Sequence, residues 1–270
     1  MYIFLRSFLR KIFQVFNLGL IKHRDLATLH QVFIDYTCLL NKLDFFFEFN
    51  TVWIAAKNMP SKHLNFLLDS KSQNGQDLLA LLSNDFKKGG IFIEFGAYDG
   101  VIFSNTYLLE KQFGWSGILI DPIPNHYKSM KLNRKCKLIH GAITAEKQHS
   151  VLIEELPASD LSRLVEKPGI FKKTHEVKSF TLQEVIDQNL PNVGIDFLSI
   201  DIEGNDIDIL KSLDLNRYKI NTVCVEHNFR EGSDEIIGYM DIKGYDLVYS
   251  EFSKNDYWFV LRKSKLTIEV

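Results

Sequence analysis

The segment from Ile91 to Gly100, IFIEFGAYDG, constrains the fold of this chain more than any other. Its apolar start is typical of a strand that is buried on both faces of a parallel sheet. Gly96 and Gly100 then allow backbone angles and close approaches that a Cβ would block. The segment predicts a strand followed by a glycine turn, which is either a tight connection within an α/β fold or a place where backbone meets a ligand.

Strand and helix patterns alternate after this turn, which argues for βαβ units and a mostly parallel sheet. The last two strands are joined by only a short polar segment, so we expect the final strand to run antiparallel. The expected fold class is therefore α/β, with a Rossmann-like sheet. The expected strands are 91–95, 117–121, 137–140, 195–201, 222–226, 245–249 and 257–261, and the expected helices are 76–83, 106–113, 206–213 and 235–242.

Composition indicates an ordinary globular protein of 270 residues with 46% hydrophobic residues, enough for a packed core. The net charge of −2 gives no bulk attraction to nucleic acid, which we do not expect as a partner. Cys38, Cys136 and Cys224 are scattered without a C-x-x-C pair. They are expected to be reduced, buried thiols in a cytoplasmic protein.

Residues 1–74 are expected to form a mostly helical extension ahead of the main domain, 75–270. Met1 to Leu20 has the pattern of an amphipathic helix, interrupted too often by basic residues to span a membrane. Its apolar face would pack on its own domain or a second subunit, or lie peripherally on a membrane. Within the main domain, residues 144–192 are expected to be a less regular insertion and a candidate substrate region, ending in a capping box that starts at Thr181.

Carboxylates follow several of the predicted strands, at the edge where open parallel sheets bind ligands. They are Glu94, Asp121, Asp201 and Glu226, and a further strand ends at Gly141-Ala142. Asp121 follows the second strand, where an acid can accept hydrogen bonds from a ribose diol. A nucleoside cofactor is therefore expected at these strand ends.

The choice between a dinucleotide and S-adenosylmethionine depends on the glycine turn. The turn lacks the third glycine of G-x-G-x-x-G and carries Glu94 and Asp99. These acids would repel a pyrophosphate, whereas they would attract the ammonium and sulfonium groups of S-adenosylmethionine. The residues favour S-adenosylmethionine.

These motifs together resemble the FkbM family of S-adenosylmethionine-dependent methyltransferases. The resemblance covers roughly 72–263, and the first 70 or so residues lie outside it. It implies a class I methyltransferase sheet of the Rossmann-like kind. The motifs are IEFGAYDG from Ile93, Ser104-Asn105-Thr106, Trp115-x-Gly117, Asp121-Pro122, IDFLSIDIEGND from Ile195, and Val225-Glu226-His227-Asn228.

The resemblance also implies the cofactor site. Asp121 would bind the ribose, and Ala142 and Asp201, at two further strand ends, complete the expected site. Glu94 departs from the Asp that is commoner in the family, which leaves its detailed contact open. The residues expected at or beside the methionyl part are Glu94, Gly96, Ala97, Asp99, Gly100 and Asn105.

Characterised family members mostly methylate hydroxyl groups of sugars or polyketides, so the expected acceptor is a sugar, glycan or related hydroxylated small molecule. Such a hydroxyl needs a base or a metal to become nucleophilic. His227 is the candidate base, in a catalytic group with Asp201 and Glu226. Alternatively Asp201 and Glu226, with His227 or Asn228, could hold magnesium or manganese.

Two functions from other classes remain open. One is a non-catalytic binding module on a methyltransferase fold, docked through the N-terminal helices to a membrane or a larger assembly. The other is a nucleotide-dependent oxidoreductase, which the acids of the glycine turn disfavour. Binding of S-adenosylmethionine or NAD would separate these alternatives.

Overall fold

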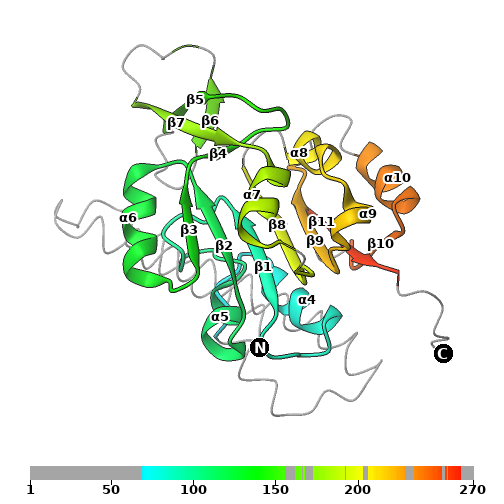
Figure 1. Ribbon diagram of the computed structural model, residues 1–270. Helices are drawn as coiled ribbons and strands as arrows, with labels where there is room; N and C mark the ends of the chain where they lie inside the picture. The colour runs from blue at the N-terminus through cyan, green and yellow to red at the C-terminus, as the bar shows by residue number, and fades with distance from the viewer. Residues whose placement is uncertain are drawn as a thin grey trace, which may run out of the picture. The chain divides into compact units, whose positions relative to one another are not determined.

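A seven-stranded sheet forms the centre of the computed structural model (Figure 1). The structure describes residues 69–155, 162–165, 167, 173–191, 193–202, 206–228, 234–250, 253 and 255–262. The strand order is β10-β11-β9-β8-β1-β2-β3. The strands are β1 (Ile91–Phe95), β2 (Ser116–Asp121), β3 (Lys137–His140), β8 (Phe197–Ile200), β9 (Thr222–Glu226), β10 (Tyr245–Leu247) and β11 (Asp256–Leu261).

The pairing of these strands gives a doubly wound sheet. The order β3-β2-β1-β8-β9 is entirely parallel, and the chain reverses direction across the sheet between β1 and β8. Strand β11 runs antiparallel to both of its neighbours, β9 and β10. The Rossmann-like class with an antiparallel final strand, predicted from the sequence, is confirmed.

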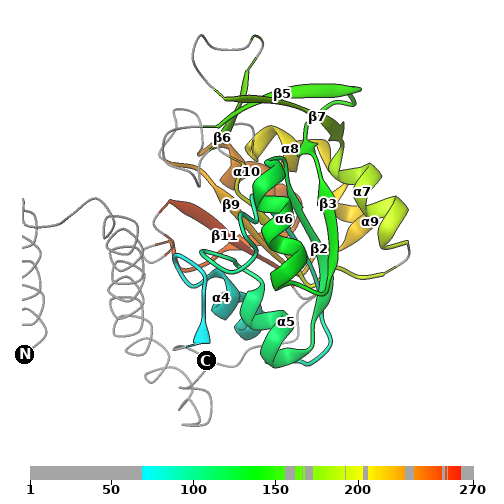
Figure 2. The same cartoon turned by 90° about the vertical axis from the view of Figure 1, so that its left-hand side faces the viewer.

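Helices cover both faces of the sheet, as Figure 2 shows from the side. One apolar core lies under α4, α5 and α6 and includes Phe92 and Phe197. The other lies under α7, α8, α9 and α10 and includes Ile93 and Leu198. Successive strand residues thus enter opposite cores because side chains alternate along a strand. The helices are α4 (Gln76–Ser83), α5 (Tyr107–Phe113), α6 (Pro124–Asn133), α7 (Leu182–Asn189), α8 (Asp206–Ser212), α9 (Leu215–Tyr218) and α10 (Glu235–Ile242).

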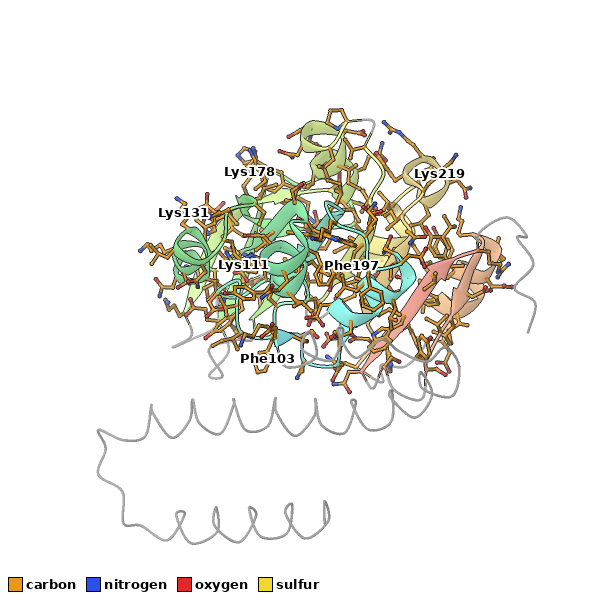
Figure 3. The ribbon with its side chains drawn as sticks, turned by 90° about the horizontal axis from the view of Figure 1, so that it is seen from below. Phe103, Lys111, Lys131, Lys178, Phe197 and Lys219 are labelled. Carbon is orange, nitrogen blue, oxygen red and sulfur yellow. The ribbon has the colours of Figure 1, made fainter. Side chains whose placement is uncertain are left out.

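Figure 3 contrasts the interior with the periphery of this layered body. Phe197 lies among the packed elements and is fully buried, whereas Lys111, Lys131 and Lys219 project from the outer helices and connections. The apolar runs of the sequence therefore become strands covered on both sides, as expected for a parallel sheet.

The insertion after β3 is more regular than the sequence suggested. It contains a second sheet of order β4-β7-β5-β6, which lies beyond the carboxyl ends of the central strands in Figure 1. The capping box at Thr181 is confirmed, since its hydroxyl accepts from Glu184 N and the Glu184 side chain accepts from Thr181 N. The strands are β4 (Ala142–Ile143), β5 (Ser150–Glu155), β6 (Ser162–Val165) and β7 (Thr174–Phe180).

Helices α6 and α9 were not predicted from the sequence. Helix α6 begins at Pro124, which suits the first turn of a helix, but buries only His126 and Met130. Its outer face is polar and basic, so it lacks the apolar periodicity that announces a helix. The expected N-terminal helices, the first of them Met1 to Leu20, lie outside the described residues.

The described part of the chain also bears on the membrane and cysteine predictions. None of its helices combines the length and the apolar character needed to cross a bilayer. Cys136 and Cys224 are free thiols, Cys224 buried and Cys136 half-buried, while Cys38 lies outside the described residues.

Candidate active site

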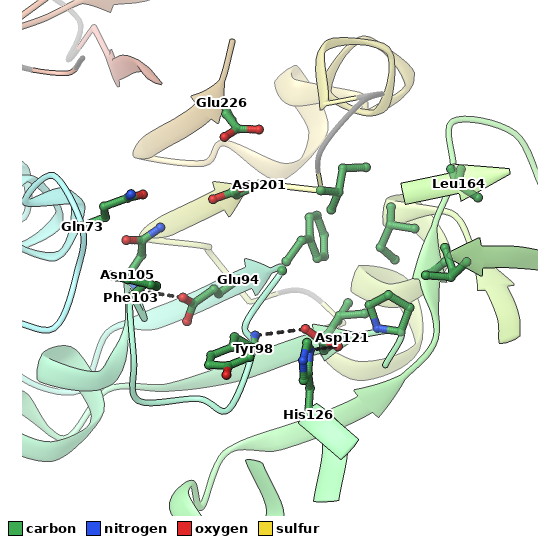
Figure 4. Close-up of a pocket in the computed structure, with 18 of the residues that line it drawn as sticks. Gln73, Glu94, Tyr98, Phe103, Asn105, Asp121, His126, Leu164, Asp201 and Glu226 are labelled. Atoms are coloured by element: carbon green, nitrogen blue, oxygen red, sulfur yellow. Dashed lines mark hydrogen bonds and ion pairs between the residues drawn. The ribbon is translucent and has the colours of Figure 1, made fainter. Parts of the chain in front are cut away.

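A cavity of about 280 Å³ opens at the carboxyl ends of the central strands (Figure 4). Four adjacent strands each direct one carboxylate to it: Glu94 from β1, Asp121 from β2, Asp201 after β8 and Glu226 from β9. The structure thus brings together the strand-end acids identified in the sequence. The described lining residues also include Gln73, Gln76, Phe95, Gly96, Tyr98, Phe103, Asn105, Ile120, Pro122, His126, Gly141, Ala142, Ile143, Ile153, Leu164, Ile202, Asn228 and Asn255.

One side of the cavity is apolar and is formed partly by the second sheet. Ile153 of β5 and Leu164 of β6 join Phe95 and Ile143 in the lining. The opposite side carries most of the polar groups, and Figure 4 shows Gln73 and Asn105 there, away from Leu164. The insertion therefore supplies a wall of the cavity.

Glu94 is buried at the base of the polar side. Its Oε1 accepts a hydrogen bond from Asn105 N at 2.6 Å, and its Oε2 accepts from Ser104 Oγ at 3.0 Å and from the Thr106 hydroxyl. Burial raises the pKa of Glu94, while the charge of Arg134 and these hydrogen bonds act to lower it. Both carboxylate oxygens are thus engaged by the chain's own donors.

Asn105 extends from this cluster into the cavity lining. Its Nδ2 donates to Ser199 Oγ at 2.8 Å, and its Oδ1 is buried with no hydrogen-bond partner among the described residues. The residue is 6% exposed. An acceptor left unsatisfied in this way is unusual in a folded protein and calls for an explanation.

The glycine turn contributes only part of its length to the cavity. Gly96 has a φ of 68° and its backbone is exposed there. Ala97, Asp99 and Gly100, expected at the cofactor from the resemblance, are not among the lining residues. Ala97 is packed in the core, while Asp99 Oδ1 accepts from Val101 N and Ile102 N, both at 2.8 Å, and so closes the turn itself.

Asp121 is held in one orientation by three donors. Its Oδ2 accepts from Tyr98 N at 3.0 Å and its Oδ1 from Ile123 N at 2.8 Å, and His126 Nδ1 lies 3.1 Å from Oδ1. The His126 ring also meets Tyr98 edge-on, with centroids 4.5 Å apart. Sequence reasoning missed His126, although its place in the first turn of the helix after Asp121 is a usable signal.

The three proposed catalytic residues do not share one environment. Asp201 and Glu226 line the cavity, whereas His227 is not among the described lining residues. The His227 ring stacks on Tyr257, with centroids 4.1 Å apart and an interplanar angle of 21°. Glu226 and Asn228 face the cavity and His227 does not, as expected where side chains alternate past the end of β9.

The described residues contain no set of ligands for the magnesium or manganese ion considered in the sequence analysis. Among them, no group of three or more His, Cys, Asp and Glu side chains is arranged to hold an ion. A role of Asp201 and Glu226 in binding magnesium or manganese stays a prediction.

Carboxamides are the other functional groups that sequence reasoning largely passed over. Gln76 Nε2 donates to Asp256 Oδ2 at 2.5 Å, and Gln76 Oε1 accepts from Asn74 N at 3.0 Å. Gln76 and Asp256 are 180 residues apart in the chain, so no local motif reveals their contact. The carboxamide residues in the lining are Gln73, Gln76, Asn105, Asn228 and Asn255.

Comparison with known proteins gives one family match. Residues 94–247, more than half of the chain, match the model of the Methyltransferase FkbM domain. No curated protein matches the sequence.

Two solved structures are also similar. The first is methyltransferase FkbM from Methylobacillus flagellatus KT, with 10% identity, a TM-score of 0.42 and coverage of 65% of this chain and 44% of that chain. This chain thus spans less than half of that protein's length. The second is precorrin-6y C5,15-methyltransferase from Geobacter metallireducens GS-15, with 9% identity, a TM-score of 0.39 and coverage of 68% of this chain and 85% of that chain.

Proposed function

Because this chain belongs to the FkbM methyltransferase family, we propose that it transfers a methyl group from S-adenosylmethionine to a hydroxyl group. The acceptor is a sugar, a glycan or a related hydroxylated small molecule. The observation that carries the proposal is the cavity at the carboxyl ends of four adjacent strands, where each strand contributes one carboxylate.

The charge of the cavity supports a cationic donor. Its described lining residues include four carboxylates and neither Lys nor Arg. A pyrophosphate would need basic groups or a helix N-terminus free of acids, whereas a sulfonium and an ammonium are stabilised by nearby carboxylates. Asp121, already oriented by Tyr98 N and Ile123 N, is suited to accept a ribose hydroxyl.

The remaining lining supports a hydroxyl-rich acceptor. Carboxamides both donate and accept hydrogen bonds, as hydroxyl groups do, and the described lining residues include five of them. The apolar wall of Ile153 and Leu164 offers a surface for the carbon skeleton of either ligand.

The chemistry requires alignment and one proton transfer. The acceptor oxygen attacks the methyl carbon, the carbon–sulfur bond breaks, and its electron pair stays on sulfur, leaving neutral S-adenosylhomocysteine. The hydroxyl proton must pass to a base. Glu226 is the base in this proposal, because its side chain lines the cavity, and Asp201 is the neighbouring carboxylate.

The test combines donor binding with product analysis. Calorimetry with S-adenosylhomocysteine and with NAD should give binding of the first only. Incubation with methyl-labelled S-adenosylmethionine and a panel of methyl glycosides should then give an O-methylated product by mass spectrometry. Binding of NAD instead, or label found only on nitrogen, would contradict the proposal.

A further inference from the structure

We infer that Asn105, and not Glu94, makes the direct contact with the ammonium group of the methyl donor, and that Glu94 is the residue that positions Asn105. The inference rests on the proposed function, because it concerns the donor that we assign to this cavity. It reverses the expectation from the sequence, in which the carboxylate of Glu94 itself attracts the ammonium group.

The first step is the saturation of Glu94. Arg134 donates to Ser104 Oγ at 3.0 Å and to Thr106 Oγ1 at 3.0 Å. Because a guanidinium has no acceptor, both hydroxyls accept from Arg134, and each has its single proton left for Glu94. With Asn105 N as a third donor, the carboxylate is held by its own chain and is only 2% exposed.

The second step is the anchoring of Asn105 at two points. Its backbone N–H donates to Glu94 on β1, and its side-chain Nδ2 donates to Ser199 on β8. Glu94 and Ser199 are direct partners in the register of these two strands. The two anchors therefore leave the Asn105 amide with one orientation, and they leave Oδ1 as its available acceptor.

The third step is the state of that acceptor. Asn105 Oδ1 is buried and has no hydrogen-bond partner among the described residues, and Figure 4 shows the Asn105 side chain in the cavity lining between Gln73 and Glu94. A buried unsatisfied acceptor costs about 1–3 kcal/mol, which a bound donor group would recover. The site is therefore ready for a ligand that brings an N–H or O–H group.

The ammonium group is the donor that fits this position. Asn105 lines the cavity at the end away from Asp121, as Figure 4 shows, and hence away from the ribose. The methionyl part of the ligand occupies that end in the proposed function. A charged N–H donor also forms a stronger hydrogen bond with an amide oxygen than a neutral hydroxyl does.

The experiment uses three ligands that share the adenosine and the thioether sulfur and differ in the amino-acid part. S-adenosylhomocysteine carries the ammonium and the carboxylate, its decarboxylated analogue keeps only the ammonium, and 5′-methylthioadenosine has neither. Calorimetry on the full chain compares these ligands for the unaltered protein and for Asn105→Ala. We expect about 10- to 100-fold weaker binding of the first two and a change below about threefold for the third.

Two further variants separate direct contact from positioning. Ser199→Ala, which removes only the side-chain anchor, should cause a smaller loss with the same ligand selectivity. Glu94→Gln should add no selective loss in the Asn105→Ala background, because its effect passes through Asn105. Asn228→Ala, a carboxamide elsewhere in the lining, is the matched control and should affect the three ligands equally.

The outcomes that would overturn the inference are specific. The first is an equal loss of affinity for all three ligands in Asn105→Ala, and the second is no loss of affinity for any of them. The third is a loss of affinity for the two ammonium ligands that is larger in Glu94→Gln than in Asn105→Ala. If Asn105→Ala does not fold, the same comparison of the three ligands on Ser199→Ala tests the inference in its place. Failure of the unaltered protein to bind any of the three would instead overturn the proposed function.

Discussion

Gly96, in the turn after β1, packs against the backbone carbonyl of Asp201, which follows β8. A Cβ at Gly96 would overlap the Asp201 oxygen, and the residue also has a φ of 68°. The neighbouring strand end therefore requires this glycine independently of any ligand. At the same time its exposed backbone forms part of the cavity, so one residue serves both the packing of two strands and the candidate site.

Gly96→Ala should destabilise the fold and abolish donor binding. The left-handed backbone costs about 1–2 kcal/mol for alanine, and the overlap with Asp201 raises the expected loss to about 3 kcal/mol or more. Gly89→Ala is the matched control, because Gly89 has a φ of 69° but no atom within 4 Å of an added Cβ. Gly89→Ala should lose only the unfolding free energy that the left-handed backbone costs an alanine, about 1–2 kcal/mol. Urea unfolding measures both, and equal losses would contradict the packing argument.

Glu226→Gln should lower kcat by about 10²- to 10⁴-fold, because it removes the proposed base while keeping the size of the side chain. The dissociation constant for S-adenosylhomocysteine should change little. Initial rates and calorimetry on the same preparation separate the two effects. A variant with unimpaired turnover would exclude Glu226 as the base.

His227→Phe should keep kcat within about threefold, because His227 stacks on Tyr257 and is not among the described cavity residues. Phenylalanine preserves a flat ring for that stacking. The measurement is kcat at saturating donor beside Glu226→Gln. A loss of 100-fold or more would restore His227 as the base and contradict the role of Glu226.

Arg134→Met should cost about 3–5 kcal/mol of unfolding free energy, because the fully buried guanidinium joins Glu110 to the Ser104 and Thr106 hydroxyls. Burial acts to raise the pKa of Glu110, but Arg134 and Lys135 N outweigh it and lower that pKa to about 2. Arg217→Met, which breaks the exposed pair with Asp187, should cost less than about 1 kcal/mol. Chemical denaturation of both variants tests the contrast.

Asp256→Asn should change how stability depends on pH. Burial raises the pKa of Asp256 from 3.8 to about 6, so the folded state binds this proton more tightly than the unfolded state does. The unfolding free energy of the unaltered protein therefore falls by up to about 3 kcal/mol as pH rises from about 4 to 6. That of the variant does not change in this way, because asparagine stays neutral. The variant still offers Gln76 Nε2 an acceptor.

The check on Asp256 is the difference in unfolding free energy, variant minus unaltered protein, measured from pH 4 to 8. It should rise up to about pH 6 and then level off. A difference that stays constant across this range would show that Asp256 has no raised pKa.

The sequence was informative where a property is local. The expected strand at 91–95 and the helix at 76–83 have the bounds of β1 and α4, because each depends on the periodicity of neighbouring residues. The capping box at Thr181 was readable for the same reason. Helix α6 was missed because only two of its residues, His126 and Met130, are buried, and two residues give no clear helical pattern among its solvent-facing neighbours.

The sequence by itself thus determined the α/β class, the antiparallel final strand and the meeting of carboxylates at the strand ends, because strand direction and topology follow from the order of elements. Only the tertiary structure decided what each of those side chains contacts. Glu94 is saturated by the segment at Ser104, His227 turns to Tyr257, and the second sheet encloses the apolar wall. Such contacts join residues that no local periodicity relates, and their geometry depends on how the layers pack.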